Sequence, residues 1–250
     1  MHKFIKQAKS LIGTRLKSQS AEHDHLILNE AVSFDKHVIF IAVPKTGTTT
    51  VRNQLRPKGK PLIPNPHLNI MQVRDTLYTY LLRSSLEQNT RYPTEDVATD
   101  AEVRARTQHL FDTFFKFSAV RNPWARAVSL FFRREGIQVK DSMSFETFCE
   151  HHLYASDTCK HPTLHKNQFD WMSDENGDFA LDYVYKVEDF AKAIREIEER
   201  TEGRLKLQYK ESNANPNSRS GSYRDLYSDR TRKLIADRFY KDIDFFKFTF

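Results

Sequence analysis

Residues 37–50 are His-Val-Ile-Phe-Ile-Ala-Val-Pro-Lys-Thr-Gly-Thr-Thr-Thr, an apolar run followed by a short polar loop. The run over residues 37–43 is continuous and rich in β-branched residues, which is typical of a parallel strand buried on both faces. Pro44 ends this strand, and residues 49–55 can form a helix. A strand that passes through a short loop into a helix is the unit from which parallel α/β sheets are built.

The loop from Pro44 to Thr50 has the composition of a phosphate or sulfate site. A loop that joins a strand end to a helix start directs several backbone N–H groups and the positive end of the helix dipole toward one point. Gly47 allows the backbone to approach a ligand closely, Lys45 supplies a positive charge, and the last three threonines add hydroxyl donors. The alternative is a threonine-rich helix cap that binds nothing.

This loop differs from the phosphate-binding loop of nucleoside triphosphatases. The pattern GxxxxGK[ST] is absent, the lysine stands at the start of the loop, and no strand ends in an evident acidic ligand for Mg²⁺. A P-loop nucleotide kinase, which would require Mg²⁺ and ATP, is therefore an alternative only. A non-catalytic nucleotide-binding or peripheral membrane module is the other alternative.

A second strand-to-helix junction follows the apolar run Phe114–Val120. Asn122 can cap the next helix, and Pro123 suits its first turn. The planar guanidinium of Arg121 can bind a phosphate through two hydrogen bonds, and Ser129 lies two helical turns beyond the cap on the same face. Because open α/β folds bind ligands at the carboxyl ends of their strands, the two loops together predict a two-phosphate site there.

The rest of the chain continues the alternation of strands and helices. Apolar residues at helical spacing predict further helices, and another apolar run predicts a third strand. The helices are Ile70 to about Ser84, Pro123 to about Phe132, a short one capped by Ser144, Phe190 to a stop at Gly203, and Thr231–Tyr240; the strand is Asp182–Val187. Residues 56–66, with four prolines and a glycine, are expected to form a loop, and the tail Phe245–Phe250 is expected to pack on the core.

The predicted fold class is α/β, a P-loop-type three-layer fold with a mostly parallel central sheet flanked by helices. A single domain is expected over residues 30–250, preceded by a basic amphipathic segment over residues 1–20. That segment holds five basic and no acidic side chains, so most of the net charge of +6 lies there and the remaining residues are nearly neutral. A nucleic-acid-binding surface is not expected, because it requires a broad electropositive field.

The basic segment has apolar residues at helical spacing from Phe4 to Leu16. This pattern fits a helix docked on the domain, a loose terminus, or a weak contact with a membrane surface. No stretch approaches the roughly 18 apolar residues of a membrane span, and neither a signal peptide nor an N-x-Ser/Thr glycosylation sequence is present. A cytoplasmic location is therefore expected, and a membrane tether outside this sequence is left open.

Cysteines and histidines cluster between residues 149 and 165. Six potential metal ligands fall in this stretch: Cys149, His151, His152, Cys159, His161 and His165. They contain no CxxC motif, and Pro162 between the last two histidines opposes a helical pair. The two cysteines do not form a disulfide framework either. No metal site is predicted, and an acceptor-facing loop with polar histidines is the favoured interpretation.

The two strand-end loops resemble the 5′-phosphosulfate and 3′-phosphate binding motifs of sulfotransferases that use 3′-phosphoadenosine 5′-phosphosulfate (PAPS). The surrounding sequence resembles the carbohydrate branch, Golgi-type and bacterial, over roughly residues 37–250. Its other matching parts are Phe115–Trp124, His165–Phe190 with Gln168 and Trp171, and a tail with Asn217, Arg219, Tyr223 and Arg224. The resemblance implies metal-free transfer of a sulfuryl group from PAPS to a hydroxyl acceptor, most naturally on a carbohydrate; oligomeric state is not implied.

The same resemblance implies roles for individual residues. The 5′-phosphosulfate would be held by Lys45, Thr46, Gly47, Thr48, Thr49 and Thr50, and the 3′-phosphate by Arg121 and Ser129. Lys45 would also act in catalysis, by stabilising the charge that builds on the leaving phosphate. The segment from Arg219 to Tyr223 would close over the nucleotide.

The general base is the open assignment. Many relatives carry a histidine in a short His-Ala-Thr-like segment before the second strand, where this chain has Glu95–Asp100 with Val97 at the corresponding position. The candidates are the carboxylates Glu95, Asp96 and Asp100 and the imidazoles His67 and His109, and an ordinary surface role is the alternative for each. His67 and Asp96 are taken as the catalytic candidates beside Lys45, and a weakly active or repurposed family member is left open.

Overall fold

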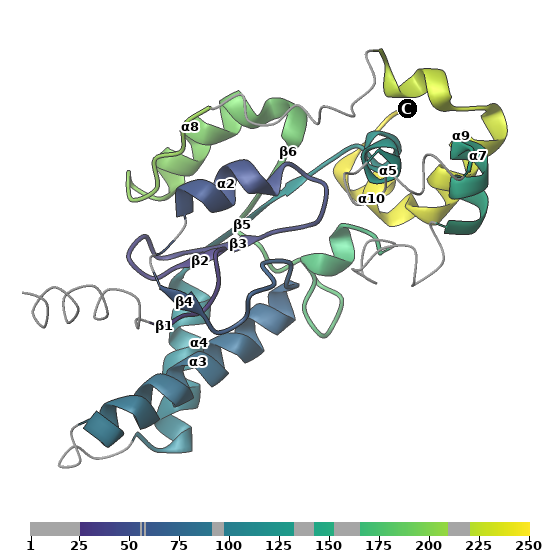
Figure 1. The fold of residues 1–250 in the computed structure, drawn as a ribbon. Helices are drawn as coiled ribbons and strands as arrows, with labels where there is room; N and C mark the ends of the chain where they lie inside the picture. Colours follow the sequence, from purple (N-terminus) through teal and green to yellow (C-terminus); the bar gives the residue numbers. More distant parts are fainter. Residues whose placement is uncertain are drawn as a thin grey trace, which may run out of the picture.

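The computed structural model describes residues 26–55, 57, 59–91, 98–132, 143–152, 166–209 and 221–250. Its centre is a four-stranded sheet in the order β2-β3-β5-β6 (Figure 1). The strands are β2 (Val32–Ser33), β3 (Val38–Ile41), β5 (Phe115–Val120) and β6 (Tyr183–Lys186). Strands β3, β5 and β6 are parallel, and β2 at the edge is antiparallel to β3. The three apolar runs therefore form the parallel part of the sheet, as predicted.

Strand β3 is buried on both faces, as its continuous apolar run predicts. Ile39 and Ile41 belong to a core cluster with α3 and α4, whereas Val38 and Phe40 belong to a second cluster with α2 and α8. Their side chains alternate between the clusters because successive residues of a strand point to opposite faces. Burying a side chain of this size stabilises the fold by about 1.5–3 kcal/mol, so β3 anchors both layers.

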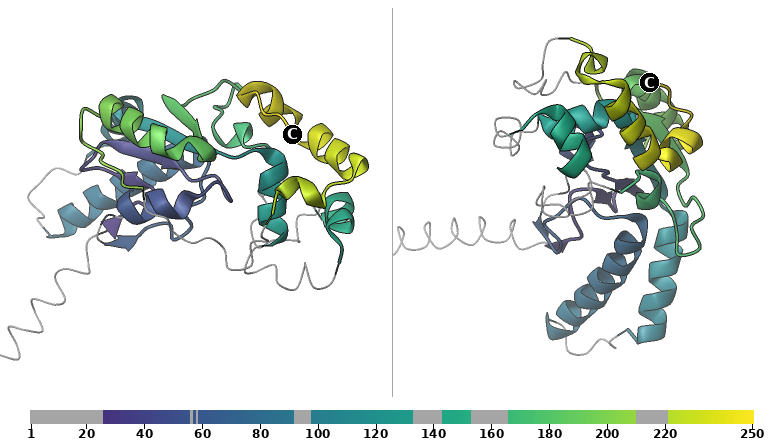
Figure 2. Two further views of the ribbon diagram at one scale, coloured as in Figure 1. Left: turned by 90° about the horizontal axis from the view of Figure 1, so that it is seen from above. Right: turned by 90° about the vertical axis from the view of Figure 1, so that its right-hand side faces the viewer.

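Helices cover both faces of the sheet (Figure 1). One face carries α2 (Thr48–Leu55) and α8 (Phe190–Arg200), and the other carries the long hairpin of α3 (Ile70–Arg91) and α4 (Asp100–Thr113). The chain is thus an α/β protein with a mostly parallel sheet flanked by helices. The hairpin of α3 and α4 extends well beyond the sheet, as both views of Figure 2 show.

The remaining helical elements gather beyond the carboxyl end of β5 (Figure 2). They are α5 (Pro123–Phe131), α7 (Phe145–Thr147), the π-helical η2 (Phe148–His152), the 3-10 helices η4 (Phe169–Trp171) and η6 (Tyr223–Leu226), α9 (Asp229–Arg238) and α10 (Tyr240–Phe246). A further 3-10 helix, η5 (Val187–Asp189), joins β6 to α8. The loops at the carboxyl edge of the sheet therefore lie between the sheet and this helical group.

Local sequence signals set several helix ends. Asn122 caps α5 by accepting a hydrogen bond from the N–H of Trp124 at 3.1 Å, and Pro123 is the first helical residue, as predicted. Ser144 caps α7, also as predicted. Capping boxes at Thr99 and Ser228 begin α4 and α9, and the sequence analysis did not identify them.

The proline-rich segment differs from the expectation. Residues 56–66 were expected to be a loop, yet β4 (Lys60–Pro61) pairs in parallel with β1 (Leu26–Ile27). The N–H of Leu62 continues the pairing by donating to the carbonyl of Ile27 at 2.8 Å. Proline has no N–H to donate to a neighbouring strand. It is tolerated in β4 because an edge strand has a hydrogen-bonded neighbour on one side only. The composition signal for a loop was therefore wrong at these two residues.

Two helices also extend the sequence-based prediction. Helix α3 continues to Arg91, past its expected end near Ser84, and α10 forms between the predicted last helix and the predicted tail, where no element was predicted. The tail itself does pack on the core, with Phe246 and Phe248 buried in the same cluster as β3. Within the described part of the chain, every helix is too short or too polar to cross a membrane. The basic segment of residues 1–20 lies outside the described residues.

Candidate functional site

The loop after β3 has an unusual backbone. Lys45 and Gly47, on either side of Thr46, have left-handed φ values of 69° and 70°. Residues that alternate between right- and left-handed conformations turn successive N–H groups to one side and form an anion-binding concavity. For Lys45, which has a Cβ, this conformation costs about 1–2 kcal/mol. Strain of this kind occurs at functional sites, and the left-handed residues give the loop a backbone that could bind an anion.

The threonines of this loop differ in their surroundings. Thr46 and Thr48 are buried, Thr49 is exposed and Thr50 is partly exposed. The hydroxyl of Thr46 donates to the carbonyl of Val43 at 2.9 Å. Its side chain therefore stabilises the turn, and among the predicted ligands Thr46 would act through its backbone rather than its hydroxyl.

Gly47 is exposed but lies close to the residue that follows β6. A Cβ built on Gly47 would lie 3.0 Å from Cγ2 of Val187, in η5. Because β5 lies between β3 and β6 in the sheet, the loop after β3 reaches over the end of β5 toward the end of β6. Gly47 is thus required both for its left-handed φ and for its lack of a side chain.

Arg121 follows the last residue of β5, next to the first loop. Its backbone N–H donates to Oε1 of Gln168 at 2.9 Å, and its carbonyl accepts from Nε2 of Gln168 at 2.8 Å. Burial lowers the pKa of its guanidinium, and the charge of Glu188 acts in the opposite direction. The buried Nε of Arg121 has no hydrogen-bond acceptor among the described residues. A buried, positively charged N–H group that lacks an acceptor could donate a strong hydrogen bond to an anionic ligand.

Helix α5 connects the two loops directly. Arg126 is buried, and its Nε donates to the carbonyl of Pro44 at 3.1 Å. Ser129, one helical turn further along α5, is partly exposed. The structure thus places the first loop, Arg121 and helix α5 at one edge of the sheet, as expected from the strand order.

His67 also reaches this edge, from the proline-rich segment. Its Nδ1 lies 2.7 Å from the carbonyl oxygen of Ala42, three positions before Lys45. A carbonyl oxygen can only accept, so Nδ1 carries a proton, and whenever the ring is neutral its lone pair is on Nε2. This tautomer is the one that allows Nε2 to accept a proton.

The other described base candidates lie elsewhere. Asp100 is at the start of α4, where the hairpin is farthest from the sheet (Figures 1 and 2). Hydrogen bonds from Tyr78 and then Arg104 hold its pKa below the ordinary value. His109 is exposed near the end of α4, which precedes β5 and so lies at the opposite edge of the sheet from the two loops. Glu95 and Asp96 lie outside the described residues.

Tyr223, in η6, packs against the C-terminal tail beside the start of α5. Its ring centroid is 6.0 Å from that of Phe250, which in turn lies 5.5 Å from the ring of Trp124 in α5. Arg219 lies outside the described residues. Of the segment from Arg219 to Tyr223, which was predicted to close over the nucleotide, the structure therefore places Tyr223 near the start of α5.

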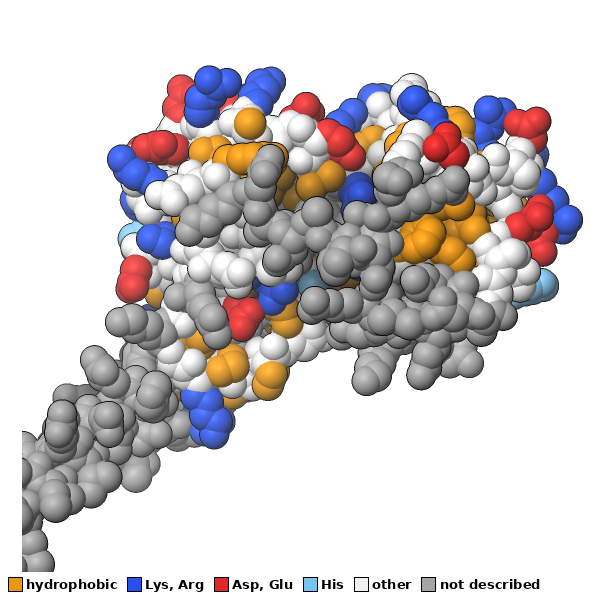
Figure 3. Space-filling view, turned by 45° about the horizontal axis from the view of Figure 1, so that its top comes forward, with side chains coloured by type: hydrophobic (Ala, Val, Ile, Leu, Met, Phe, Trp, Pro, Cys, Tyr) orange, Lys and Arg blue, Asp and Glu red, His pale blue; other side chains and the backbone are white. Residues whose placement is uncertain are grey.

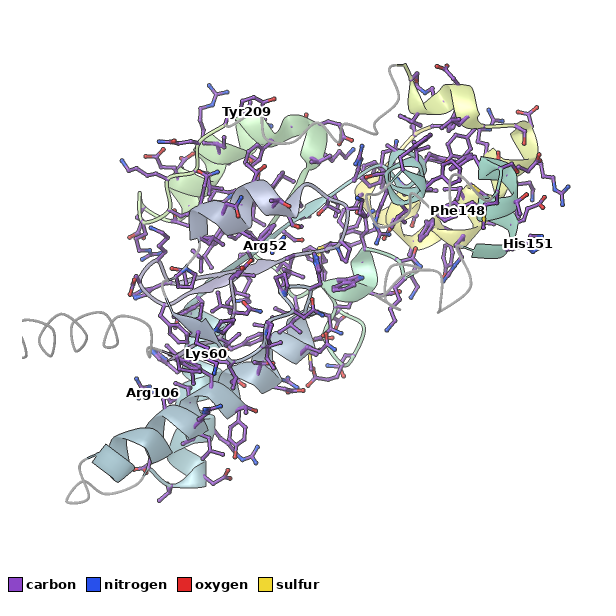
Figure 4. All side chains as sticks on the ribbon, in the orientation of Figure 1. Arg52, Lys60, Arg106, Phe148, His151 and Tyr209 are labelled. Carbon is purple, nitrogen blue, oxygen red and sulfur yellow. The ribbon has the colours of Figure 1, made fainter. Side chains whose placement is uncertain are left out.

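The cysteine and histidine cluster is described only in part. Cys149 is buried, and burial raises the pKa of its thiol to about 12. His151 is exposed and lies at the outer side of η2 (Figure 4). No group of three potential metal ligands occurs within the described residues, and Cys159, His161 and His165 lie outside them.

The charge distribution agrees with a small anionic ligand. Figure 3 shows Lys and Arg side chains interspersed with Asp and Glu over the visible face. Most of the charged pairs lie at the surface, such as Arg104 with Asp100 and Lys233 with Asp237. On this face the described residues form no broad electropositive field of the kind that nucleic acids require.

Comparison with known families decides the class of the protein. A model of the sulfotransferase family matches residues 30–249, which include both loops and every described helix and strand except β1. The chain belongs to the sulfotransferase family. No curated protein and no solved structure gave a significant match. The family places this chain among transferases of the sulfuryl group.

The sequence assigned no role at the site to three buried polar residues around it. Gln168, Arg126 and Asp242 are all buried, and hydrogen bonds connect them to the two loops or to one another. Gln168 was identified only as part of the family resemblance. A buried polar residue carries no signal of its own in a single sequence, because its partners, here as many as 82 positions away, are brought near only by folding.

Proposed function

We propose that this sulfotransferase transfers a sulfuryl group from PAPS to a hydroxyl of a carbohydrate acceptor. The observation that carries the proposal is the position of two anion-binding features at the ends of two adjacent parallel strands. The first is the left-handed loop at Lys45 and Gly47 after β3, and the second is Arg121 after β5. Adjacent strands lie about 4.8 Å apart, so the two features suit the two phosphates of one nucleotide.

The residues present fit such a donor. The N–H groups of the loop, the ammonium of Lys45 and the hydroxyls of Thr49 and Thr50 would hold the 5′-phosphosulfate. Arg121, whose buried Nε has no acceptor among the described residues, and Ser129 would hold the 3′-phosphate. Thr48, at the first position of α2, would add the positive end of the helix.

The chemistry divides between charge stabilisation and proton transfer. PAPS supplies an activated sulfuryl group attached to a phosphate leaving group. In such transfers the attacking and leaving oxygens lie in line, and negative charge grows on the leaving oxygen. Lys45 and the loop N–H groups would stabilise that charge. The bond from sulfur to the acceptor oxygen forms as the bond from sulfur to the phosphate oxygen breaks, and the acceptor loses its proton to a base.

His67 is the base that the geometry favours. Its Nδ1–H donates to the carbonyl of Ala42, so Nε2 is the ring nitrogen that would accept the proton of the acceptor hydroxyl. The same hydrogen bond becomes stronger when the ring is protonated, because the donor is then charged. Asp96 remains the second candidate from the sequence.

Binding of adenosine 3′,5′-bisphosphate, the desulfonated product, tests the donor site. Isothermal titration calorimetry should show saturable binding to the wild type. Lys45→Ala or Arg121→Ala should weaken it by about 10- to 100-fold, because each removes one charged contact of about 1.5–3 kcal/mol. Absence of binding to the wild type at millimolar nucleotide would refute the proposal.

Transfer of labelled sulfate from PAPS to a panel of glycans tests the acceptor class and the base. His67→Ala should lower kcat by about 10²- to 10⁴-fold and leave the affinity for adenosine 3′,5′-bisphosphate unchanged. The matched control is His109→Ala, at the opposite edge of the sheet, which should keep full activity. Equal activity of the two variants would remove His67 from the mechanism, and the absence of transfer to every glycan would remove the carbohydrate acceptor.

A further inference from the structure

The side-chain amide of Gln168 takes the place of a neighbouring strand at Arg121. The pairing of β5 with β6 ends at Val120, opposite Lys186. At the next residue, Gln168 accepts from the N–H of Arg121 at 2.9 Å and donates to its carbonyl at 2.8 Å. The amide thereby fixes both backbone hydrogen-bonding groups of Arg121. Because Gln168 is fully buried, water does not compete for these bonds.

Asp242 fixes the orientation of Gln168. Oδ2 of Asp242 accepts from the backbone N–H of Gln168 at 2.8 Å and from its side-chain Nε2 at 3.1 Å. Oδ1 accepts from the N–H of Phe169 at 2.9 Å. If the amide of Gln168 were flipped, its oxygen would face the carboxylate and its NH₂ would face the N–H of Arg121. Asp242 therefore selects the only orientation in which Gln168 can hold Arg121.

The same segment also holds the first loop. Arg126 donates through Nε to the carbonyl of Pro44 at 3.1 Å and through Nη1 to the carbonyl of Lys166 at 3.3 Å. Residues 166–169 are thus connected to the loop after β3 through Arg126 and to the loop after β5 through Gln168. Arg126 and Gln168, which make the two connections, are not among the residues that the proposed function assigns to the nucleotide.

We infer that Gln168, oriented by Asp242, is a positioning residue that sets the place of Arg121 relative to the first loop. It thereby gives the site its preference for nucleotides with a 3′-phosphate over 5′-monophosphates. The inference rests on the proposed function, in which Arg121 binds the 3′-phosphate. Hydrogen bonds to a phosphate weaken steeply with displacement and misalignment, so a small movement of the Arg121 backbone is enough to lose the contact.

The test measures the dissociation constants of two ligands, adenosine 3′,5′-bisphosphate and adenosine 5′-monophosphate. The ratio of the two constants reports the 3′-phosphate contact alone, because all other contacts are shared. In Gln168→Met, which keeps the length of the side chain but neither hydrogen bond, the ratio should fall by about tenfold or more, while binding of the monophosphate changes less than about twofold. Asp242→Asn is an isosteric and milder change that should shift the ratio in the same direction. The N–H groups of Gln168 and Phe169 donate to both oxygens of the carboxylate, and an amide has only one oxygen to accept them.

The control separates positioning from stability. Thr201 is buried in another part of the fold, where its hydroxyl donates to the carbonyl of Ile197 at 2.7 Å. Thr201→Val should lower the melting temperature and leave the ratio unchanged. An unchanged ratio in a folded Gln168→Met or Asp242→Asn protein, or a parallel loss of affinity for both ligands, would overturn the inference. A wild type that binds neither ligand would instead refute the proposed function.

Discussion

At the scale of single residues, the first loop depends most directly on Gly47. Its φ of 70° lies in the region that favours glycine, and a Cβ at this position would lie only 3.0 Å from Cγ2 of Val187. Lys45 adopts nearly the same φ without the advantage of glycine. The left-handed conformation of Lys45 is therefore unfavourable locally. Packing around the loop must supply the free energy that stabilises this conformation.

Gly47→Ala should destabilise the protein by about 1–2 kcal/mol from the backbone alone, with a further cost from the contact with Val187. The loop should also move, so binding of adenosine 3′,5′-bisphosphate should weaken by about tenfold or more. Chemical denaturation and calorimetry measure the two effects.

The double variant Gly47→Ala/Val187→Ala separates these causes. Removing the Val187 side chain relieves the contact that a Cβ at position 47 would make at 3.0 Å, but the left-handed φ remains costly. The double variant should therefore be more stable than expected from the sum of the single changes, yet less stable than Val187→Ala alone. Additive effects would show that the predicted contact does not form.

At the scale of elements, the C-terminal segment connects α10 to the start of α5. Lys247 is left-handed, with φ of 53°, and turns the chain at the end of α10. Phe248 then enters the core, and the carbonyl of Thr249 accepts from Nδ2 of Asn122 at 2.8 Å. The cap of α5, and with it the residue after Arg121, is therefore supported by the tail.

Phe248→Ala should destabilise the protein by about 3–5 kcal/mol, because it leaves a cavity in the core. Phe248 is only 7% exposed, whereas Phe245, in α10, is 46% exposed. Phe245→Ala is therefore the matched control and should cost about 1 kcal/mol. Urea denaturation of both variants checks this difference, and equal losses would contradict the packing of the tail.

At the scale of the whole molecule, a buried carboxylate connects segments that are far apart in the sequence. Asp242 in α10 holds the start of η4 and, through Gln168, the end of β5. Burial raises its pKa above the ordinary value, although the N–H donors of Gln168 and Phe169 and the charge of Arg126 oppose the shift. Ionising Asp242 therefore costs more in the folded protein than in the unfolded chain.

This raised pKa predicts the direction of a pH effect on stability. Asp242 loses its proton at about pH 3.9 in the unfolded chain. In the folded protein it loses its proton at a higher pH. Between these values the folded state binds more protons, so the contribution of Asp242 to the free energy of unfolding falls as pH rises. The difference in that free energy between wild type and Asp242→Asn should thus decrease from about pH 4 upward and then become constant.

Urea unfolding of both proteins at a series of pH values and constant ionic strength measures this difference. A difference that increases with pH would mean that the hydrogen bonds to the carboxylate outweigh its burial.

Much of the fold was accessible from the sequence because its signals are local. The apolar runs at Val38–Ile41 and Phe115–Val120 predicted the parallel strands, and Asn122 with Pro123 predicted the start of α5. The prediction failed at Lys60–Pro61, where pairing with β1 outweighs the loop-forming preference of proline. It also missed α10, whose apolar face is defined by contacts with the rest of the core and not by its own spacing.

For the site, the sequence by itself determined which chemical groups are available: a lysine, a glycine and threonines after one strand, and an arginine after the next. These are properties of short segments, and a strand-loop-helix unit places them at a strand end wherever it occurs. Only the tertiary structure distinguishes the surroundings of His67 from those of His109 and Asp100, by placing His67 against Ala42 at the end of β3. Only folding, too, brought Gln168 and Asp242 behind Arg121. The physical reason is that a hydrogen bond depends on the distance between two atoms, and for residues tens of positions apart that distance is set by the packing of the whole chain.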